Sequence, residues 1–151
     1  MRSGPGDLGE RMLRAFERSF TEGCTETVVV GADSPTLPVS VVERSFERLR
    51  AGACAIVAPS VDGGYVLLGL REPRPELFAE LPWGTPEVLR LTRERARTAA
   101  VELELLPSWY DIDDECGLRM LERELRQPAA ALRAPATARY LAGGIDRAEP
   151  G

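Results

Sequence analysis

The stretch 28–38, Val-Val-Val-Gly-Ala-Asp-Ser-Pro-Thr-Leu-Pro, constrains the fold of this chain more than any other segment. Its short run of valines predicts a strand of a parallel sheet, buried on both faces, and the glycine and Ser-Pro predict a turn after it. Such a strand delivers the carboxylate of Asp33 to the carboxyl edge of the sheet, where open α/β sheets bind ligands. Prolines follow here in place of a phosphate-cradling glycine loop. The stretch therefore indicates a metal-assisted site for a phosphorylated substrate.

Helices and strands alternate along the rest of the chain. Asp7, with Glu10 three residues later, predicts a capped helix start, and Thr85 with Pro86 predicts another. Helices are expected over 7–21, 38–51, from 85 onward and over 114–126 (with Leu118, Leu121 and Leu125 inward), a helical turn over 75–81, and strands over 26–31, 53–58, 65–70 and 101–106. This order predicts an α/β fold with a mostly parallel sheet.

The length of 151 residues predicts one domain. We expect the domain to cover 7–126 and an Ala/Pro/Gly-rich tail to cover 127–151, with a short helix near 137–141. No apolar run approaches the ~20 residues of a membrane span. The first residues carry no apolar signal-peptide core, so a cytoplasmic location is expected.

Two absent residue types narrow the chemistry. The chain has no histidine, and all 19 of its basic residues are arginines. Catalysis through histidine, a Schiff-base lysine or a P-loop lysine is therefore excluded. Carboxylates, hydroxyls, backbone amides, arginine and a metal remain.

Charge and cysteine content exclude other classes. The net charge of −5 argues against nucleic-acid binding. The arginines at 90, 93, 95 and 97 favour a solvated helix face over a nucleic-acid patch. The three cysteines, Cys24, Cys54 and Cys116, are too widely spaced for a zinc site or a disulfide framework.

Asp33 is the first candidate for the chemistry. As a metal ligand at a strand end it would have Ser34 and Thr36 beside it to contact phosphate or sugar. The alternative is a turn residue that caps the helix beginning at Pro38.

The second candidate is Asp62-Gly63-Gly64-Tyr65. An aspartate and two glycines between strands are most simply a turn. The glycines would also permit close approach of a ligand and leave amides facing an anion. Tyr65 would stack on a base or sugar, or pack in the core.

The third candidate is the acidic run 111–115. Asp111 and Asp113 alternate, so they would share one side of an extended segment, where a hard cation such as Mg²⁺ or Mn²⁺ would offset their repulsion. The alternative is that the run serves the dipole of the next helix, with Asp114 as its N-cap.

The last candidate is Trp83, which would form a pocket wall or pack at a hinge.

Four motifs in order, VVVGADSPTLP, APSVDGGYVLLGL, ELFAELPWGTPEVLRLT and LLPSWYDIDDECGL, resemble a bacterial family of radical-SAM/selenodomain-associated transferases over about residues 7–125. That family has the glycosyltransferase-A (nucleotide-diphospho-sugar transferase) fold and is related to 2-phospho-lactate guanylyltransferase. The resemblance implies a fold of three α/β/α layers that lacks the family's N-terminal strands. The chain departs from the family pattern at Gly117, where an acid is usual. It also departs at the N-terminus, where the family's first strands and nucleotide-binding loop would precede Asp7.

The resemblance implies a role for each matching residue. Asp33, Asp111 and Asp113 would hold Mg²⁺ or Mn²⁺. Asp62 would be catalytic, and the substrate-binding residues would be Ser34, Thr36, Gly63, Gly64, Tyr65, Trp83 and Thr85.

The expected function is metal-dependent glycosyl transfer from a nucleoside-diphosphate-sugar to an unknown acceptor. The alternatives are nucleotidyl transfer from a nucleoside triphosphate, and a non-catalytic remnant. Absent first strands would leave a hydrophobic sheet edge, so we expect a homo-oligomer or self-association.

Overall fold

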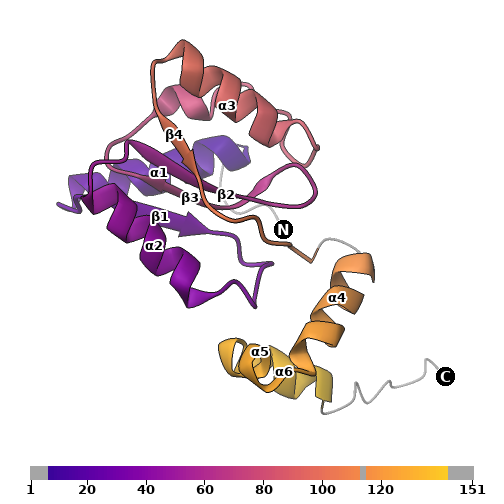
Figure 1. The fold of residues 1–151 in the computed structure, drawn as a ribbon. Helices are drawn as coiled ribbons and strands as arrows, with labels where there is room; N and C mark the ends of the chain where they lie inside the picture. The colour runs from indigo at the N-terminus through magenta and orange to yellow at the C-terminus, as the bar shows by residue number, and fades with distance from the viewer. Residues whose placement is uncertain (1–6, 113–114, 143–151) are drawn as a thin grey trace.

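The computed structural model describes residues 7–112 and 115–142 of the chain. Its elements follow the order α1, β1, α2, β2, β3, a 3₁₀ turn η1, α3, β4, α4, α5, α6 (Figure 1). Up to α4 this order is the one that the sequence predicts.

A four-stranded mixed sheet forms the centre, in the order β1-β3-β2-β4. The strands are β1 Thr27–Val30, β2 Ala55–Pro59, β3 Tyr65–Leu70 and β4 Leu103–Leu105. β3 pairs antiparallel with both β1 and β2, and only β2 and β4 pair in parallel. The expectation of a mostly parallel sheet is therefore wrong. The physical reason for the difference is the tight turn between β2 and β3, which makes these strands a hairpin. β3 is thereby inserted between β1 and β2, which run in the same direction.

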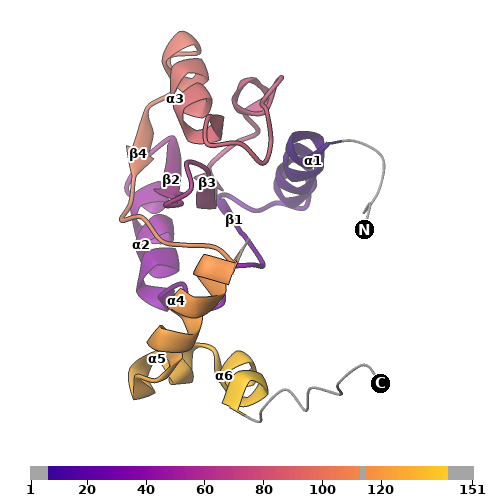
Figure 2. The same ribbon diagram turned by 90° about the vertical axis from the view of Figure 1, so that its right-hand side faces the viewer.

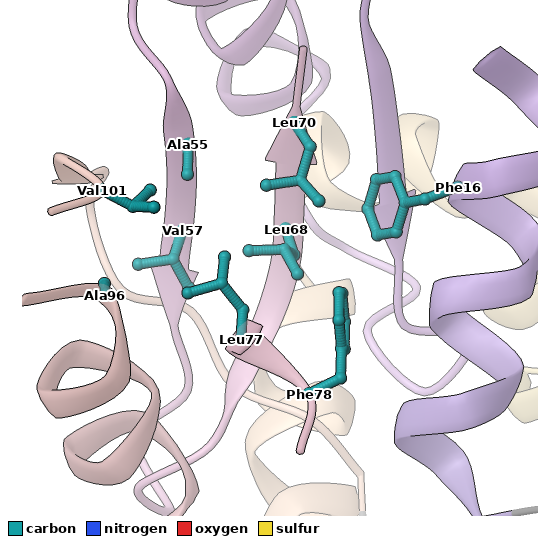
Figure 3. Close-up of a cluster of buried hydrophobic side chains, with 9 residues drawn as sticks. All are labelled: Phe16, Ala55, Val57, Leu68, Leu70, Leu77, Phe78, Ala96 and Val101. Atoms are coloured by element: carbon teal, nitrogen blue, oxygen red, sulfur yellow. The ribbon is translucent and has the colours of Figure 1, made fainter. Parts of the chain in front are cut away.

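Helices cover both faces of the sheet (Figure 2). α1 Leu8–Thr21, η1 Pro75–Leu77 and α3 Val88–Thr98 lie on one face, and α2 Val39–Arg50 lies on the other. Period-two alternation along β2 and β3 supplies both cores. The first core joins Phe16 of α1 to Val57, Leu68 and Leu77 (Figure 3). The second joins Leu49 of α2 to strand residues such as Ile56.

The start of α1 is confirmed, because the Asp7 carboxylate accepts a 2.9 Å hydrogen bond from the Glu10 amide. The predicted burial of the first strand on both faces is wrong. β1 is an edge strand of partly exposed residues, and Val30 is 40% exposed. α3 begins at Val88, later than predicted, and its N-cap residue is Glu87. The prediction of Thr85 as the cap is therefore wrong; the Thr85 hydroxyl donates to the Pro82 carbonyl oxygen at 2.7 Å.

Three helices follow the sheet: α4 Glu115–Leu125, α5 Pro128–Arg133 and α6 Pro135–Ala142. Of the leucines expected to face inward in α4, Leu121 is buried but Leu118 is 37% exposed. The region predicted as a tail thus carries α5 and α6, and the short helix expected near 137–141 lies within α6. The predicted N-cap Asp114 lies outside the described residues. None of the helices described here combines the length and the apolar character needed to cross a membrane.

Candidate ligand-binding pocket

A pocket of about 860 Å³ lies at the ends of β1 and β3, bordered by α1 and the loop before α3. It brings together seven residues that the sequence predicts as functional: Asp33, Asp62, Gly64, Tyr65, Trp83, Thr85 and Asp111. These come from four separate segments of the chain, so the fold, and not local sequence, assembles the group.

Asp33 reaches the pocket because β1 ends in a tight turn. The Gly31 amide extends the ladder with β3 by a 2.9 Å hydrogen bond to the Val66 carbonyl oxygen. A Cβ at Gly31 would lie 2.9 Å from Asp33 Oδ1, so a side chain there would push against the carboxylate. Among the described residues the exposed Asp33 carboxylate has no hydrogen-bond or ion-pair partner. Since Pro38 is the N-cap residue of α2 and no side chain caps that helix, the interpretation of Asp33 as a helix cap is wrong.

Asp111 arrives from the far edge of the sheet. After β4 the chain crosses the end of β2, where the Trp109 amide donates to the Pro59 carbonyl oxygen at 2.9 Å. It then reaches the loop after β1, where the Ile112 amide donates to the Asp33 carbonyl oxygen at 2.9 Å. The Ser60 hydroxyl donates to Asp111 Oδ1 at 2.8 Å, which orients this half-buried carboxylate.

Ser34 and Thr36, predicted to bind substrate, belong to the loop after β1, where both are buried and do not line the pocket. The Ser34 hydroxyl donates to the Tyr110 carbonyl oxygen at 2.9 Å. Thr36 donates to Glu124 Oε2 at 2.7 Å, and its hydroxyl lies 3.1 Å from that of Tyr110. Tyr110 also donates to Glu124, and Arg133 donates to Glu124 Oε1 at 2.7 Å. The hydroxyls of Ser34 and Thr36 therefore tie the loop after β1 to Tyr110 and Glu124 and do not face the pocket.

Burial, and next the hydrogen bond to Glu124, raises the pKa of Tyr110 to about 12. The phenol therefore stays protonated and keeps donating to the Glu124 carboxylate across the neutral pH range.

The Asp62-Gly63-Gly64 segment is the hairpin turn between β2 and β3. The Gly64 amide donates to Asp62 Oδ1 at 3.0 Å and the Gly63 amide donates to the Ser60 carbonyl oxygen at 3.2 Å. Both amides are thus used within the turn, and the expectation that they face an anion is wrong. Gly63 has a φ of +96°, and it lines a neighbouring hollow instead of this pocket.

Tyr65 and Trp83 form an aromatic wall. Their rings meet edge to face with centroids 6.3 Å apart, a favourable geometry for aromatic pairs. Burial raises the pKa of the Tyr65 phenol. A Cβ at Gly9 would lie 2.9 Å from Trp83 Nε1, so α1 can approach the indole only through a glycine. Trp83 therefore both lines the pocket and packs against α1.

Sequence reasoning missed the contribution of α1. Leu8, Arg11, Met12 and Ala15 line the pocket from this helix. Apolar residues recur every four positions along α1, at Leu8, Met12, Phe16 and Phe20, and this stripe predicts core packing. Arg11 stands beside the stripe. It is the arginine of the pocket lining, which also carries three aspartates. The position of Arg11, directly before the stripe residue Met12, is the sequence signal that could have identified it as a pocket residue.

The acidic residues of the pocket suit a hard divalent cation. Mg²⁺ commonly binds through one or two carboxylates plus substrate phosphates, and Asp33 and Asp111 offer two carboxylates. Within 7–112 and 115–142, no three acidic or thiol side chains gather as a complete metal site. Asp113, the third predicted ligand, lies outside these residues. Two carboxylates alone would leave most of the coordination shell of such a cation to water or to a bound ligand.

The fold and the pocket define an α/β protein with an aspartate-lined site at the carboxyl end of β1 and the amino end of β3. The chain belongs to a bacterial protein family, DUF2064, described as uncharacterized and conserved in bacteria, whose model matches residues 1–85. Among proteins of curated function no match is found.

One solved structure shares the architecture along most of the chain. The chain is similar to the crystal structure of a "putative nucleotide-diphospho-sugar transferase" from Desulfovibrio desulfuricans G20, with a TM-score of 0.76 and 31% sequence identity. The match covers 91% of this chain and 63% of that one, so this chain spans less than two thirds of the length of its structural relative.

Proposed function

We propose that the pocket binds a nucleoside-diphosphate-sugar together with Mg²⁺ or Mn²⁺, and that the chain has the chemistry of a glycosyltransferase of the glycosyltransferase-A type. One observation carries the proposal: Asp33, Asp62 and Asp111 meet in one pocket from three different strand ends. Of these, Asp33 and Asp111 offer the two carboxylates through which Mg²⁺ commonly binds beside substrate phosphates. The named function of the structural relative supports the same class.

Each residue has a distinct part in this proposal. Asp33 and Asp111 would hold the metal, which neutralises charge on the diphosphate leaving group when bound. Asp62, at the rim formed by the hairpin turn, would accept the proton of the acceptor hydroxyl as that oxygen bonds to the sugar and the diphosphate departs. Tyr65 and Trp83 would give the sugar or base an aromatic surface.

The experiment is calorimetric titration of the full chain with Mn²⁺ and a panel of nucleoside diphosphates, nucleoside-diphosphate-sugars and nucleoside triphosphates. The proposal expects micromolar binding of a diphosphate ligand that requires the metal. Asp111→Asn should weaken that binding at least about tenfold, since it removes one charged ligand. Glu43→Gln removes an equal charge from the exposed face of α2 and should leave it unchanged.

Two outcomes would replace the proposal. Metal-dependent binding of a triphosphate with release of pyrophosphate from it would assign nucleotidyl transfer on the same fold. If no nucleotide binds at micromolar affinity, catalysis by this chain alone is untenable and the domain is a non-catalytic remnant.

A further inference from the structure

A second hollow lies against α3, on the other side of the hairpin turn. It has a volume of about 250 Å³ and six lining residues: Gly63, Pro86, Leu89, Arg90, Arg93 and Arg97. We call it the α3 groove. Its lining is rich in arginine, whereas the pocket lining contains three aspartates and one arginine.

The wall between the two hollows is one residue thick. Asp62 and Gly64 line the pocket while Gly63 lines the α3 groove, and in the next segment Val88 lines the pocket while Leu89 lines the groove. The Leu89 amide donates to the Gly63 carbonyl oxygen at 3.0 Å and closes the wall. A Cβ at Gly63 would lie 2.3 Å from the Pro86 carbonyl oxygen, so this contact requires glycine.

The arginines of α3 differ in how they are neutralised. Arg90 is paired with Glu87 at 2.6 Å and with Glu94 at 3.2 Å. Arg95 belongs to another face, where it donates to the Glu80 carbonyl oxygen at 3.1 Å.

Arg93 and Arg97 have no carboxylate partner among the residues described. Like charges four residues apart destabilise a helix, so two unpaired guanidinium groups at this spacing carry a cost. Both open onto the α3 groove. Two exposed guanidinium groups without a carboxylate partner among the described residues therefore border one hollow.

We propose that the α3 groove binds the phosphate monoester of the acceptor substrate, an inference that rests on the proposed transferase function. Guanidinium groups match phosphate oxygens with paired hydrogen bonds, and two of them balance a dianion. The groove has less than a third of the pocket's volume, so it suits a phosphate group and not a nucleotide. Asp62 precedes Gly63 in the chain and lines the pocket on the other side of the wall, so an acceptor held by its phosphate in the groove would reach over the hairpin turn to bring its hydroxyl to that carboxylate.

The test uses the full chain without metal or nucleotide, so its failure is separate from failure of the nucleotide pocket. Inorganic phosphate, glycerol 3-phosphate and glycerol are titrated at constant ionic strength. The readout is nuclear magnetic resonance of the Gly63 and Leu89 amides and the Arg93 and Arg97 side chains. Both phosphates should shift these signals saturably and glycerol should not.

Variants then separate the groove from general charge. The double variant Arg93→Gln/Arg97→Gln should weaken glycerol 3-phosphate binding about tenfold or more, as expected for lost charge-assisted hydrogen bonds. Arg44→Gln/Arg126→Gln removes the same charge from exposed positions on α2 and just after α4, and should leave the affinity within twofold of the parent chain. Equal weakening in both double variants would overturn the proposal as non-specific attraction.

Competition distinguishes the sources of the phosphate. Glycerol 3-phosphate should still bind when Mn²⁺ and a nucleoside diphosphate saturate the pocket. Displacement by the diphosphate would overturn the proposal by making the groove part of the nucleotide site. Binding of inorganic phosphate without binding of glycerol 3-phosphate would overturn the acceptor role.

Discussion

The backbone amide of Ile112 donates a 2.9 Å hydrogen bond to the carbonyl oxygen of Asp33. This bond joins loops that follow β1 and β4, the two outer strands of the sheet. Because the bond uses backbone atoms, the carboxylate of Asp33 stays available to the pocket. The segment that supplies Asp111 is thereby fixed next to the segment that supplies Asp33.

Asp33→Asn should abolish most Mn²⁺ binding while barely changing stability. The Asp33 carboxylate is exposed and makes no hydrogen bond or ion pair with the described residues, so its neutralisation should change the free energy of unfolding by less than about 0.5 kcal/mol. Metal affinity is measured by calorimetry and stability by thermal melting. A variant that melts several degrees lower and keeps its metal would assign Asp33 a structural role.

Thr36→Val should destabilise the fold by about 1–3 kcal/mol, because it leaves Glu124 and Tyr110 short of a buried hydrogen-bond partner. Urea denaturation measures the change. Thr98→Val is the matched control, since the Thr98 hydroxyl only donates to the backbone of its own exposed helix turn, at Glu94. The control should stay within about 0.5 kcal/mol of the parent chain. Equal effects in the two variants would mean that the Thr36 network adds no stability.

Gly63→Ala and Gly23→Ala separate backbone strain from steric contact. Both glycines have positive φ, +96° and +99°. A Cβ at Gly23 meets nothing within 4 Å, whereas one at Gly63 meets Pro86. Gly23→Ala should therefore cost only about 1–2 kcal/mol for the left-handed backbone, and Gly63→Ala should cost more. If the urea midpoints of the two variants fall equally, the backbone at Pro86 moves aside at little cost and the steric contact at Gly63 adds nothing to the strain.

Stability should fall at alkaline pH partly through Tyr110. The pKa of Tyr110 is raised to about 12 in the folded chain, above the ordinary value near 10. The folded state then holds a proton that the unfolded state loses, so this contribution is complete below pH 10 and is lost as pH rises toward 12. Denaturation of the parent chain and of Tyr110→Phe at several pH values checks this. The parent chain should lose more stability across that interval, and parallel curves would contradict the assignment.

The chain should self-associate through β1. This edge strand pairs with β3 alone within the described residues, and it carries consecutive valines. Unprotected strand edges recruit further strands. Light scattering after size-exclusion chromatography should show species larger than one chain, and Val30→Lys should reduce them. A parent chain that stays monomeric at high concentration would rule out association along this edge.

Local sequence patterns predicted most elements, and they failed where tertiary pairing decides. The run 65–70 was predicted with the bounds that β3 has, and the Asp7 cap was predicted correctly. The valines of β1 predicted a central strand, but burial depends on which strand lies alongside. The same limit applies to the direction of pairing, since a hairpin and a crossover can follow similar strands.

The candidate site divides in the same way. Asp33 was predicted from a strand end, Asp62 from a turn and Asp111 from an acidic run, and all three line one pocket in the structure. Ser34 and Thr36 share the polarity of ligand-binding residues, yet their hydroxyls face Tyr110 and Glu124. Those partners lie 76 and 88 residues away, beyond the reach of any local pattern.

The crossing segment after β4 also sets the order in which this site can come into being. Contacts between residues so far apart in the chain form late, because they must overcome the entropy of closing a long loop. The β2–β3 hairpin, with Asp62 in its turn, closes locally. We expect Asp111 to join Asp33 only after the last strand has added to the sheet. A chain that holds its helices and the hairpin but not the segment after β4 would lack the pocket, which makes ligand binding a stricter measure of complete folding than helix content.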